Sequence, residues 1–206
     1  MSNNDQGTLF IVSAPSGAGK SSLLHAALME SQGIQLSVSH TTRTPRNGEE
    51  DGLHYNFVTT EAFGAEIEAD QFLEYAKVFD NFYGTSELWV RESLRHGNDV
   101  ILEIDWQGAE QVRKKIPEAV TLFILPPSLP TLRQRLEQRG QDSEEVIARR
   151  LEEASIEISH YNEYDYLVIN DEFDAAKRDL KSIFQAHRLK TSTQSKRNHV
   201  LLEGLL

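Results

Sequence analysis

The chain has 206 residues and a formal net charge of −11 at pH 7. That length suits one α/β core with inserted segments rather than two independent domains. The acidic balance argues against a general nucleic-acid binder, and the lack of cysteine excludes disulfides, thiolate metal sites and a cysteine nucleophile. The polar start has no signal-peptide pattern and no apolar run has membrane-spanning length, so we expect a cytoplasmic protein without nucleic-acid or membrane partners.

The first predicted strand leads into a phosphate-binding motif. Residues 9–12 are apolar, as in a buried strand, and residues 23–29 have the composition of a helix. The turn between them reads Ala14-Pro15-Ser16-Gly17-Ala18-Gly19-Lys20-Ser21-Ser22. Strand, glycine-rich turn, Gly-Lys-Ser and helix, in this order, predict a P-loop that binds phosphate through backbone N–H groups and the helix N-terminus. Lys20 would reach the terminal phosphates, and the Ser21 hydroxyl would ligate Mg²⁺.

The motif departs from its usual form at Ala14, where glycine is expected. Pro15 biases Ala14 towards extended backbone, which alanine tolerates, and Gly17 and Gly19 are kept. The alternative is an ordinary glycine and serine turn between a strand and a helix. The order of all the elements favours the P-loop.

The next part of the chain does not follow the strand–helix alternation of an α/β core. Strands are predicted at residues 34–39, 53–58 and 72–79, strand and turn at 82–85, a helix at 61–70, and turns over 40–52. We interpret residues 37–88 as an inserted α+β segment.

The alternation then returns. Helices are predicted at residues 86–96, 108–115, 129–139, 143–160 and 173–189, and strands at 99–105, 120–125 and 166–169. This order predicts an α/β fold, with a parallel sheet covered by helices. The polar residues 190–197 are predicted to form a loose linker.

Two acids stand at the end of a predicted buried strand. Asp105 closes the strand, and Glu103 alternates onto the same face. Parallel α/β sheets bind ligands at the carboxyl ends of their strands, so a carboxylate here could hold Mg²⁺ through water while the other serves a phosphate acceptor. The alternative is a pair of solvated acids.

Two groups of arginines could bind phosphate. Arg43 and Arg46 precede Tyr55 and Tyr83, whose hydroxyls can add neutral donors; the alternative is a surface pair bonded to Glu49, Glu50 or Asp51. The second group is Arg135, Arg139, Arg149 and Arg150. Arg135 and Arg139 share a helix face. The alternative for the group is solvent-side pairing with Glu137, Glu144, Glu145 and Glu152, and this is the favoured interpretation for Arg149. Two sources of arginine beside a P-loop fit a phosphoryl-transfer enzyme.

These motifs, in this order and spacing, resemble guanylate kinase of the bacterial type, a P-loop nucleoside monophosphate kinase. The matching stretches are residues 13–22, 37–46, 55–58, 72–74, 83–85, 102–108, 126–128 and 169–171. The combination Ser39-His40-Thr41-Thr42-Arg43-Thr44-Pro45-Arg46 with Tyr83-Gly84-Thr85 is far more specific than the P-loop alone. Glu103 stands where aspartate is common.

The resemblance implies a three-layer core (residues 1–36, 89–126 and 159–206), a GMP-binding insertion (37–88) and a helical lid (127–158). It implies transfer of the ATP γ-phosphoryl group to GMP, with Mg²⁺ as cofactor, and leaves association into a homo-oligomer open. The implied ATP site is residues 14–22 with Asn170 at the adenine. The implied GMP site is Ser39, Arg43, Arg46, Tyr55 and Tyr83 at the phosphate and Glu74 and Thr85 at the guanine, with Glu103 and Asp105 assisting. Lys20, Arg43, Arg135, Arg139 and Arg150 would stabilise the transferring group, and Ser21 and Asp105 would hold the metal.

Two other functions are compatible with parts of the sequence. A catalytically inactive protein-binding module of the same family would use the pocket of Arg43 and Tyr55, but the intact Gly19-Lys20-Ser21 argues against it. A P-loop kinase for another acceptor, such as a ribose phosphate, would leave Glu74 and Thr85 without a base to recognise.

Overall fold

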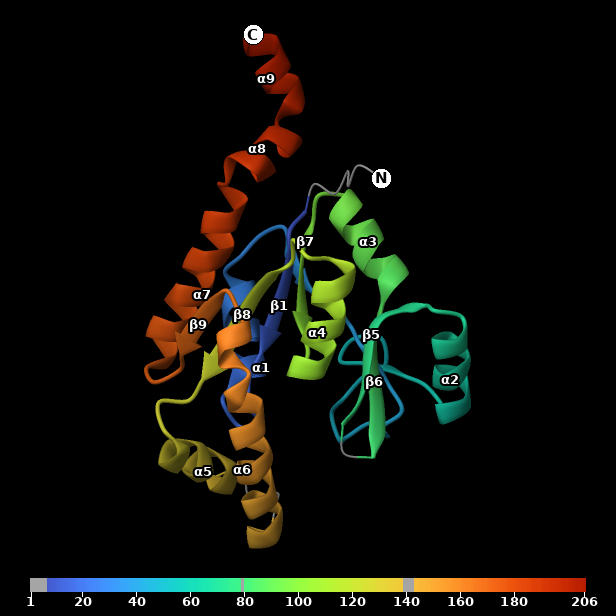
Figure 1. Ribbon diagram of the computed structural model, residues 1–206, viewed down its shortest axis with the longest axis vertical. Coiled ribbons are helices and arrows are strands. Elements are labelled where there is room, and N and C mark those ends of the chain that lie inside the picture. Colours follow the sequence, from blue (N-terminus) through green and yellow to red (C-terminus); the bar gives the residue numbers. More distant parts are fainter. Residues whose placement is uncertain (1–6, 79, 139–142) are drawn as a thin grey trace.

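The centre of the molecule is a five-stranded parallel sheet, seen in a computed structural model that describes residues 7–78, 80–138 and 143–206 (Figure 1). The strand order is β2-β7-β1-β8-β9, and every neighbouring pair is parallel. The bounds are β1 (Leu9–Ser13), β2 (Ile34–Leu36), β7 (Asp99–Glu103), β8 (Val120–Leu125) and β9 (Tyr166–Ile169). The later strands lie on both sides of β1, with β2 and β7 on one side and β8 and β9 on the other. Where the strand order reverses in this way, a ligand crevice forms at the carboxyl ends of the strands.

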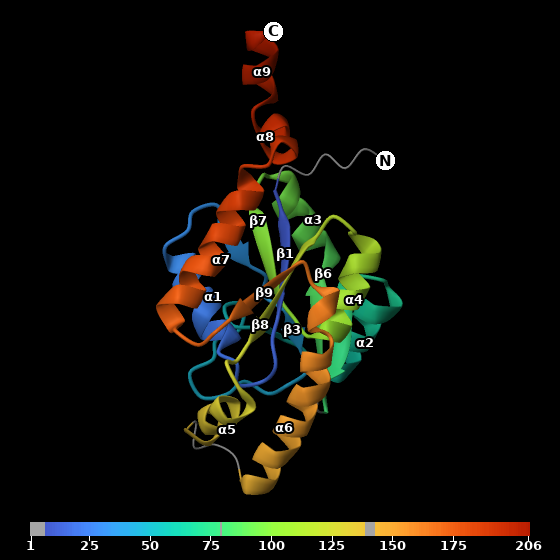
Figure 2. The ribbon, with the colours of Figure 1, turned by 60° about the vertical axis from the view of Figure 1, so that its left-hand side comes forward.

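Helices cover both faces of this sheet (Figure 2). On one face lie α1 (Lys20–Met29) and α7 (Phe173–Arg188), and on the other lie α3 (Glu87–Arg95) and α4 (Trp106–Lys115). Successive residues of β1 supply the two cores, because side chains alternate along a strand: Phe10 packs with α1 and α7, and Ile11 packs with α3 and α4. The predicted α/β core of three layers is confirmed.

A second, four-stranded sheet lies beside the core. Its order is β4-β3-β6-β5, with β3 and β4 parallel and the other pairs antiparallel. The bounds are β3 (His40–Thr41), β4 (Asn56–Phe57), α2 (Thr60–Glu68), β5 (Phe72–Val78) and β6 (Asn81–Ser86). Phe63 of α2 is buried, and its ring stacks on Phe72 and Phe82 with centroid distances of 4.5 and 5.5 Å. This aromatic cluster holds α2 on the sheet.

Two further helices project from the carboxyl edge of the parallel sheet (Figure 1). They are α5 (Leu129–Gln138) and α6 (Glu144–Ser159). A short 3₁₀ helix, η1 (Tyr161–Glu163), connects α6 to β9. Their shared core is small and consists of Leu132, Leu136, Ile147 and Ala154.

Several predicted elements differ from the structure. The strand predicted at 99–105 ends at Glu103, and the helix predicted at 108–115 begins at Trp106. The strand predicted at 34–39 pairs with β7 only to Leu36, and the one predicted at 53–58 is reduced to β4. The predicted linker at 190–197 is wrong, because those residues form α8 (Thr191–Arg197), and α9 (His199–Leu205) follows it away from the body of the molecule (Figure 2). Within the described ranges, no helix is both long and apolar enough to cross a membrane.

A buried carboxylate explains why residues 190–197 are ordered. Asp99, at the amino end of β7, is fully buried and accepts hydrogen bonds from Arg188 Nε (2.5 Å), Arg197 Nη2 (2.6 Å) and the Thr8 amide (2.8 Å). A buried charge needs such partners, so Asp99 fixes the end of α7 and α8 to the sheet.

We expect Asp99→Ala to lower the free energy of unfolding by about 3 kcal/mol, because it removes charged hydrogen bonds from two elements at once. Denaturant titration measures this. The control is Asp174→Ala, because the Asp174 carboxylate is 77% exposed beside Lys177. This variant should lower the free energy of unfolding by less than about 0.5 kcal/mol. Equal losses in the two variants would contradict the role of Asp99.

Candidate functional site

The P-loop connects β1 to α1 at the carboxyl edge of the sheet. Gly17 and Gly19 adopt φ of +92° and +89°, a left-handed conformation that favours glycine. At Gly19 a Cβ would also lie 2.7 Å from Asn170 Nδ2, so this position has no room for a side chain. Ala14 is not in the left-handed region, and alanine at this position is therefore unstrained.

The carbonyl of Ala18 ties the P-loop to β9 and α5. It accepts hydrogen bonds from Asn170 Nδ2 (2.7 Å) and Arg135 Nη1 (3.4 Å), and Arg135 Nη2 donates to the Asn170 carbonyl (2.9 Å). Both side chains therefore support the loop in this structure. Their contacts with adenine and with the transferring phosphoryl group stay predictions.

Lys20 and Ser21 lie against the end of β7. Lys20 Nζ donates to the Ile104 carbonyl (3.3 Å) and is 4.0 Å from Glu103 Oε1, which also accepts from Ser21 Oγ. Asp105 instead caps α4 by accepting from the Gly108 amide (2.8 Å). The carboxylate in contact with Ser21 is thus Glu103 rather than Asp105.

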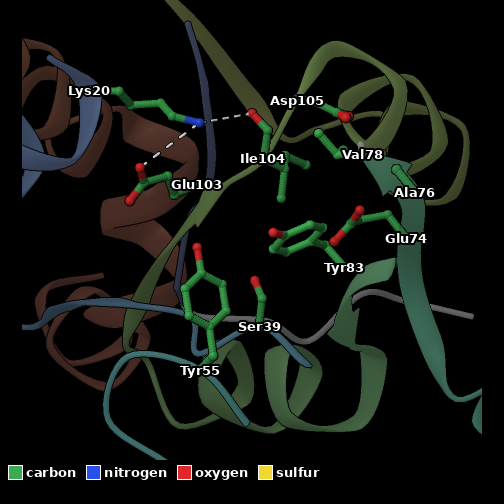
Figure 3. Close-up of a pocket in the computed structure, with 10 residues that line it drawn as sticks. All are labelled: Lys20, Ser39, Tyr55, Glu74, Ala76, Val78, Tyr83, Glu103, Ile104 and Asp105. Carbon is green, nitrogen blue, oxygen red and sulfur yellow. Dashed lines mark hydrogen bonds and ion pairs between the residues drawn. The ribbon is translucent and has the colours of Figure 1, made fainter. Parts of the chain in front are cut away.

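Two cavities meet beside Lys20. One, of about 530 Å³, lies over the P-loop and extends to Glu153 and Glu157 of α6. The other, of about 150 Å³, lies between the two sheets (Figure 3), and its lining is Lys20, Ser39, Tyr55, Glu74, Ala76, Val78, Tyr83, Glu103, Ile104 and Asp105. Both cavities are lined by Lys20, Tyr55, Val78, Tyr83 and Asp105. A ligand in one can therefore approach a ligand in the other.

Glu74 lies on β5 in the wall of the smaller cavity. The residue is only 3% exposed, and its Oε1 accepts from Thr85 Oγ1 at 2.6 Å. Burial raises the pKa of Glu74 to about 7, and the charge of Asp105 acts in the same direction, against the hydrogen bond from Thr85. When ionised, this carboxylate has only acceptor oxygens, so it can accept hydrogen bonds from the N–H groups of a ligand in the cavity.

The first arginine group shows features of both interpretations. Arg43 lies over the Tyr55 ring, 5.4 Å from its centroid, and Tyr55 contacts Tyr83 at 5.9 Å. Arg43 also forms an ion pair with Glu49 (2.8 Å), as the surface alternative required. Arg46 is exposed, and its backbone amide donates to the same Glu49. Arg43 therefore contacts a tyrosine that lines both cavities but is itself paired with an acid.

The second arginine group is divided among elements. Arg139 falls outside the described residues, and Arg150 is half-buried on α6. Arg149 is exposed on α6, as expected, and pairs with Glu153 at 3.0 Å, a glutamate that was not among the predicted partners.

Two contacts of α6 with the core had no counterpart in our sequence interpretation. Glu157 Oε2 accepts from the Ser16 amide of the P-loop (3.1 Å), and burial raises the pKa of this carboxyl group. Trp106 of α4 stacks on His160, the C-cap of α6, with a centroid distance of 3.8 Å. The one available signal was periodicity, since Glu157 lies two turns after Arg150 on the same helix face.

Comparison with known proteins identifies this arrangement. The family model described as guanylate kinase matches residues 6–187. The chain belongs to the guanylate kinase family. It is 61% identical over 201 residues to the guanylate kinase of Hahella chejuensis, covering 98% of this chain and 97% of the relative. It is 56% identical to that of Photobacterium profundum, covering 98% of both chains.

A solved structure agrees with this assignment. The crystal structure of guanylate kinase from Anaplasma phagocytophilum superposes with a TM-score of 0.74 at 34% identity and covers 91% of this chain and 89% of that one. The family resemblance and the fold predicted from the sequence are therefore confirmed.

The raised pKa of Glu74 predicts a pH dependence of stability in this guanylate kinase family member. The carboxyl group ionises near pH 4.5 in the unfolded chain and near 7 in the folded one, so stability present below pH 4.5 is lost as the pH rises to 7. The free energy of unfolding of the wild-type chain should fall by about 3 kcal/mol between about pH 5 and about pH 8, and Glu74→Gln should abolish this fall. Denaturant titration across this pH range measures both.

The control is Glu110→Gln on the surface of α4. Lys114 lowers the pKa of Glu110, so this carboxyl group titrates below this pH range. The free energy of unfolding of Glu110→Gln should therefore change with pH as it does in the wild type. If the free energy of unfolding of Glu74→Gln changed with pH as in the wild type, Glu74 would not be the cause of the pH dependence.

Proposed function

We propose that this chain transfers the γ-phosphoryl group of ATP to GMP, forming ADP and GDP. The observation that carries this conclusion is the meeting of the P-loop cavity and the Glu74 cavity at Lys20. Phosphoryl transfer between two nucleotides needs both to be held in line, with cations on the moving charge. The names of the relatives support the same reaction.

For ATP we propose the P-loop residues 14–22, with Asn170 at the adenine. Backbone N–H groups at the start of α1 would bind the phosphates, and Lys20 would leave the Ile104 carbonyl for their terminal oxygens. The Ser16 amide, now bonded to Glu157, lies in the same cavity.

For GMP we propose that the phosphate binds to Ser39, Arg43, Arg46, Tyr55 and Tyr83. Guanine would then lie against Glu74, whose two oxygens can accept from N1–H and N2–H₂. Thr85, which now donates to Glu74, would turn its hydroxyl to O6. Glu103 and Asp105 would assist from the end of β7. Adenine has no N1–H, so it would leave the buried carboxylate opposite another acceptor.

The residues around Ser21 fit Mg²⁺. A hydroxyl and a carboxylate oxygen from Glu103 are already in contact, and Mg²⁺ prefers such oxygen ligands together with phosphate and water. The described ranges hold no cluster of three histidine or acidic side chains. Mg²⁺ is commonly bound by one or two carboxylates together with substrate phosphates and water. We propose Ser21 with Glu103, or with Asp105 through water, as its protein ligands. When bound, the metal would neutralise charge on the phosphates.

We propose that closure completes the site. The insertion (37–88) and the lid (127–158) would move towards the core, bringing Arg43, Arg135, Arg139 and Arg150 to the transferring group with Lys20. Arg43 would exchange Glu49, and Arg135 would exchange the carbonyls of Ala18 and Asn170, for phosphate oxygens. Closure would also exclude water and so suppress hydrolysis of ATP.

The acceptor is tested by ADP formation from ATP and Mg²⁺ with GMP, AMP, CMP, UMP and dTMP in parallel. We expect strong stimulation by GMP alone, because among these bases only guanine presents a ring N1–H beside an amino N2–H₂ to the two oxygens of Glu74. Stimulation by none of them, with ATP still bound, would refute the proposed acceptor. Absence of ATP binding in calorimetry would favour the protein-binding module.

The same carboxylate predicts how GMP use depends on pH. Ionised Glu74 accepts both N–H groups, whereas its protonated form cannot, so kcat/KM for GMP should rise up to about pH 7 and then level off. Steady-state kinetics with Glu74→Gln is the control, because that variant keeps the titration of the GMP phosphate itself. Superimposable profiles would exclude Glu74 as the titrating group.

A further inference from the structure

Gly108 is a buried glycine whose backbone does not require glycine. It is the third residue of α4, and its φ is not in the left-handed region. Alanine is the better helix former at such a position. The reason for glycine must therefore lie in its surroundings.

Those surroundings are the carboxylate of Glu74. A Cβ on Gly108 would lie 2.6 Å from Glu74 Oε2 and 3.2 Å from its Cδ, and the next neighbour would be Ile104 Cβ at 3.4 Å. The first distance is shorter than any normal contact, so either the helix or the carboxylate would have to move.

The helix is the part that is fixed. Gln111 of α4 bonds to both backbone groups of Tyr75, accepting from its amide (3.1 Å) and donating to its carbonyl (2.7 Å). Lys115 donates to the Phe72 carbonyl at 2.8 Å. These contacts hold α4 to β5 on either side of Glu74. The carboxylate, at the end of a flexible side chain, is therefore the group that would shift.

We propose that Gly108 is a specificity-determining positioning residue, whose missing side chain leaves the space in which the Glu74 carboxylate is set for guanine. Thr85 defines one side of that space and Gly108 the other. The proposal rests on the proposed function, in which Glu74 binds the guanine. Gly108 lines neither of the two cavities, and its amide donates the hydrogen bond by which Asp105 caps α4.

The test is Gly108→Ala in the full chain. We expect KM for GMP to rise by about tenfold or more, because small displacements of a recognition group are costly, while KM for ATP changes by less than about twofold. The unfolding temperature should be unchanged or higher, since alanine favours the helix. The matched control is Gly64→Ala in α2, where a Cβ would have nothing within 4 Å and neither constant should change.

A double-mutant cycle tests whether the effect acts through Glu74. In a Glu74→Ala background, adding Gly108→Ala should leave KM for GMP unaltered, because no carboxylate remains to be displaced. An equal rise in both backgrounds, or an unfolded Gly108→Ala chain, would overturn the proposal, since the clash would then act on the backbone.

The nucleotide preference of the wild-type chain distinguishes a failure of the role of Gly108 from a failure of the proposed function. A wild-type preference for GMP that persists unchanged in Gly108→Ala would overturn the role of Gly108 alone. A wild-type chain with no preference for GMP would overturn the proposed function, and this inference with it.

Discussion

The parallel pairing of β1 with β7 is the constraint on which the whole site depends. Val12 is in register with Glu103, so both strands end at the same level of the sheet. The P-loop therefore begins beside Glu103 and Asp105, and Lys20 reaches the carbonyl of Ile104. Because β7 also leads into α4, and α4 is held to β5 by Gln111, the same pairing places the second sheet opposite the P-loop. The register between β1 and β7 therefore places both cavities beside Lys20.

A buried acid in the wall of the smaller cavity costs this protein stability. Glu74 has one strong donor, Thr85, and little access to water, so its ionised form is unfavourable in the folded chain. Asp99 is the opposite case, since two arginines and a backbone amide compensate a fully buried charge. The contrast separates a structural carboxylate from one whose unused acceptor capacity suits a ligand.

The P-loop is also one of the places at which α5 and α6 contact the core. Arg135 donates to the Ala18 carbonyl and Glu157 accepts from the Ser16 amide, so both helices bond directly to the backbone of the P-loop. The buried core that α5 and α6 share with each other is small. Phosphate at the loop would compete with Glu157 for the same amide, which gives a physical link between an occupied P-loop and the position of α6.

The sequence by itself determined the features that depend on neighbours along the chain. The P-loop is contiguous, so Gly17, Gly19 and Lys20 could be assigned in order, and the apolar patterns indicated the parallel sheet and most helices. The tertiary structure alone decided which distant groups meet: Glu157 with Ser16, Glu103 rather than Asp105 with Ser21, and Glu74 against Gly108. It also turned the polar residues after α7 into a helix, through Arg197 and the buried Asp99. Periodicity and local hydrogen bonding are properties of short segments, whereas these contacts arise only when packing brings separate segments of the chain together.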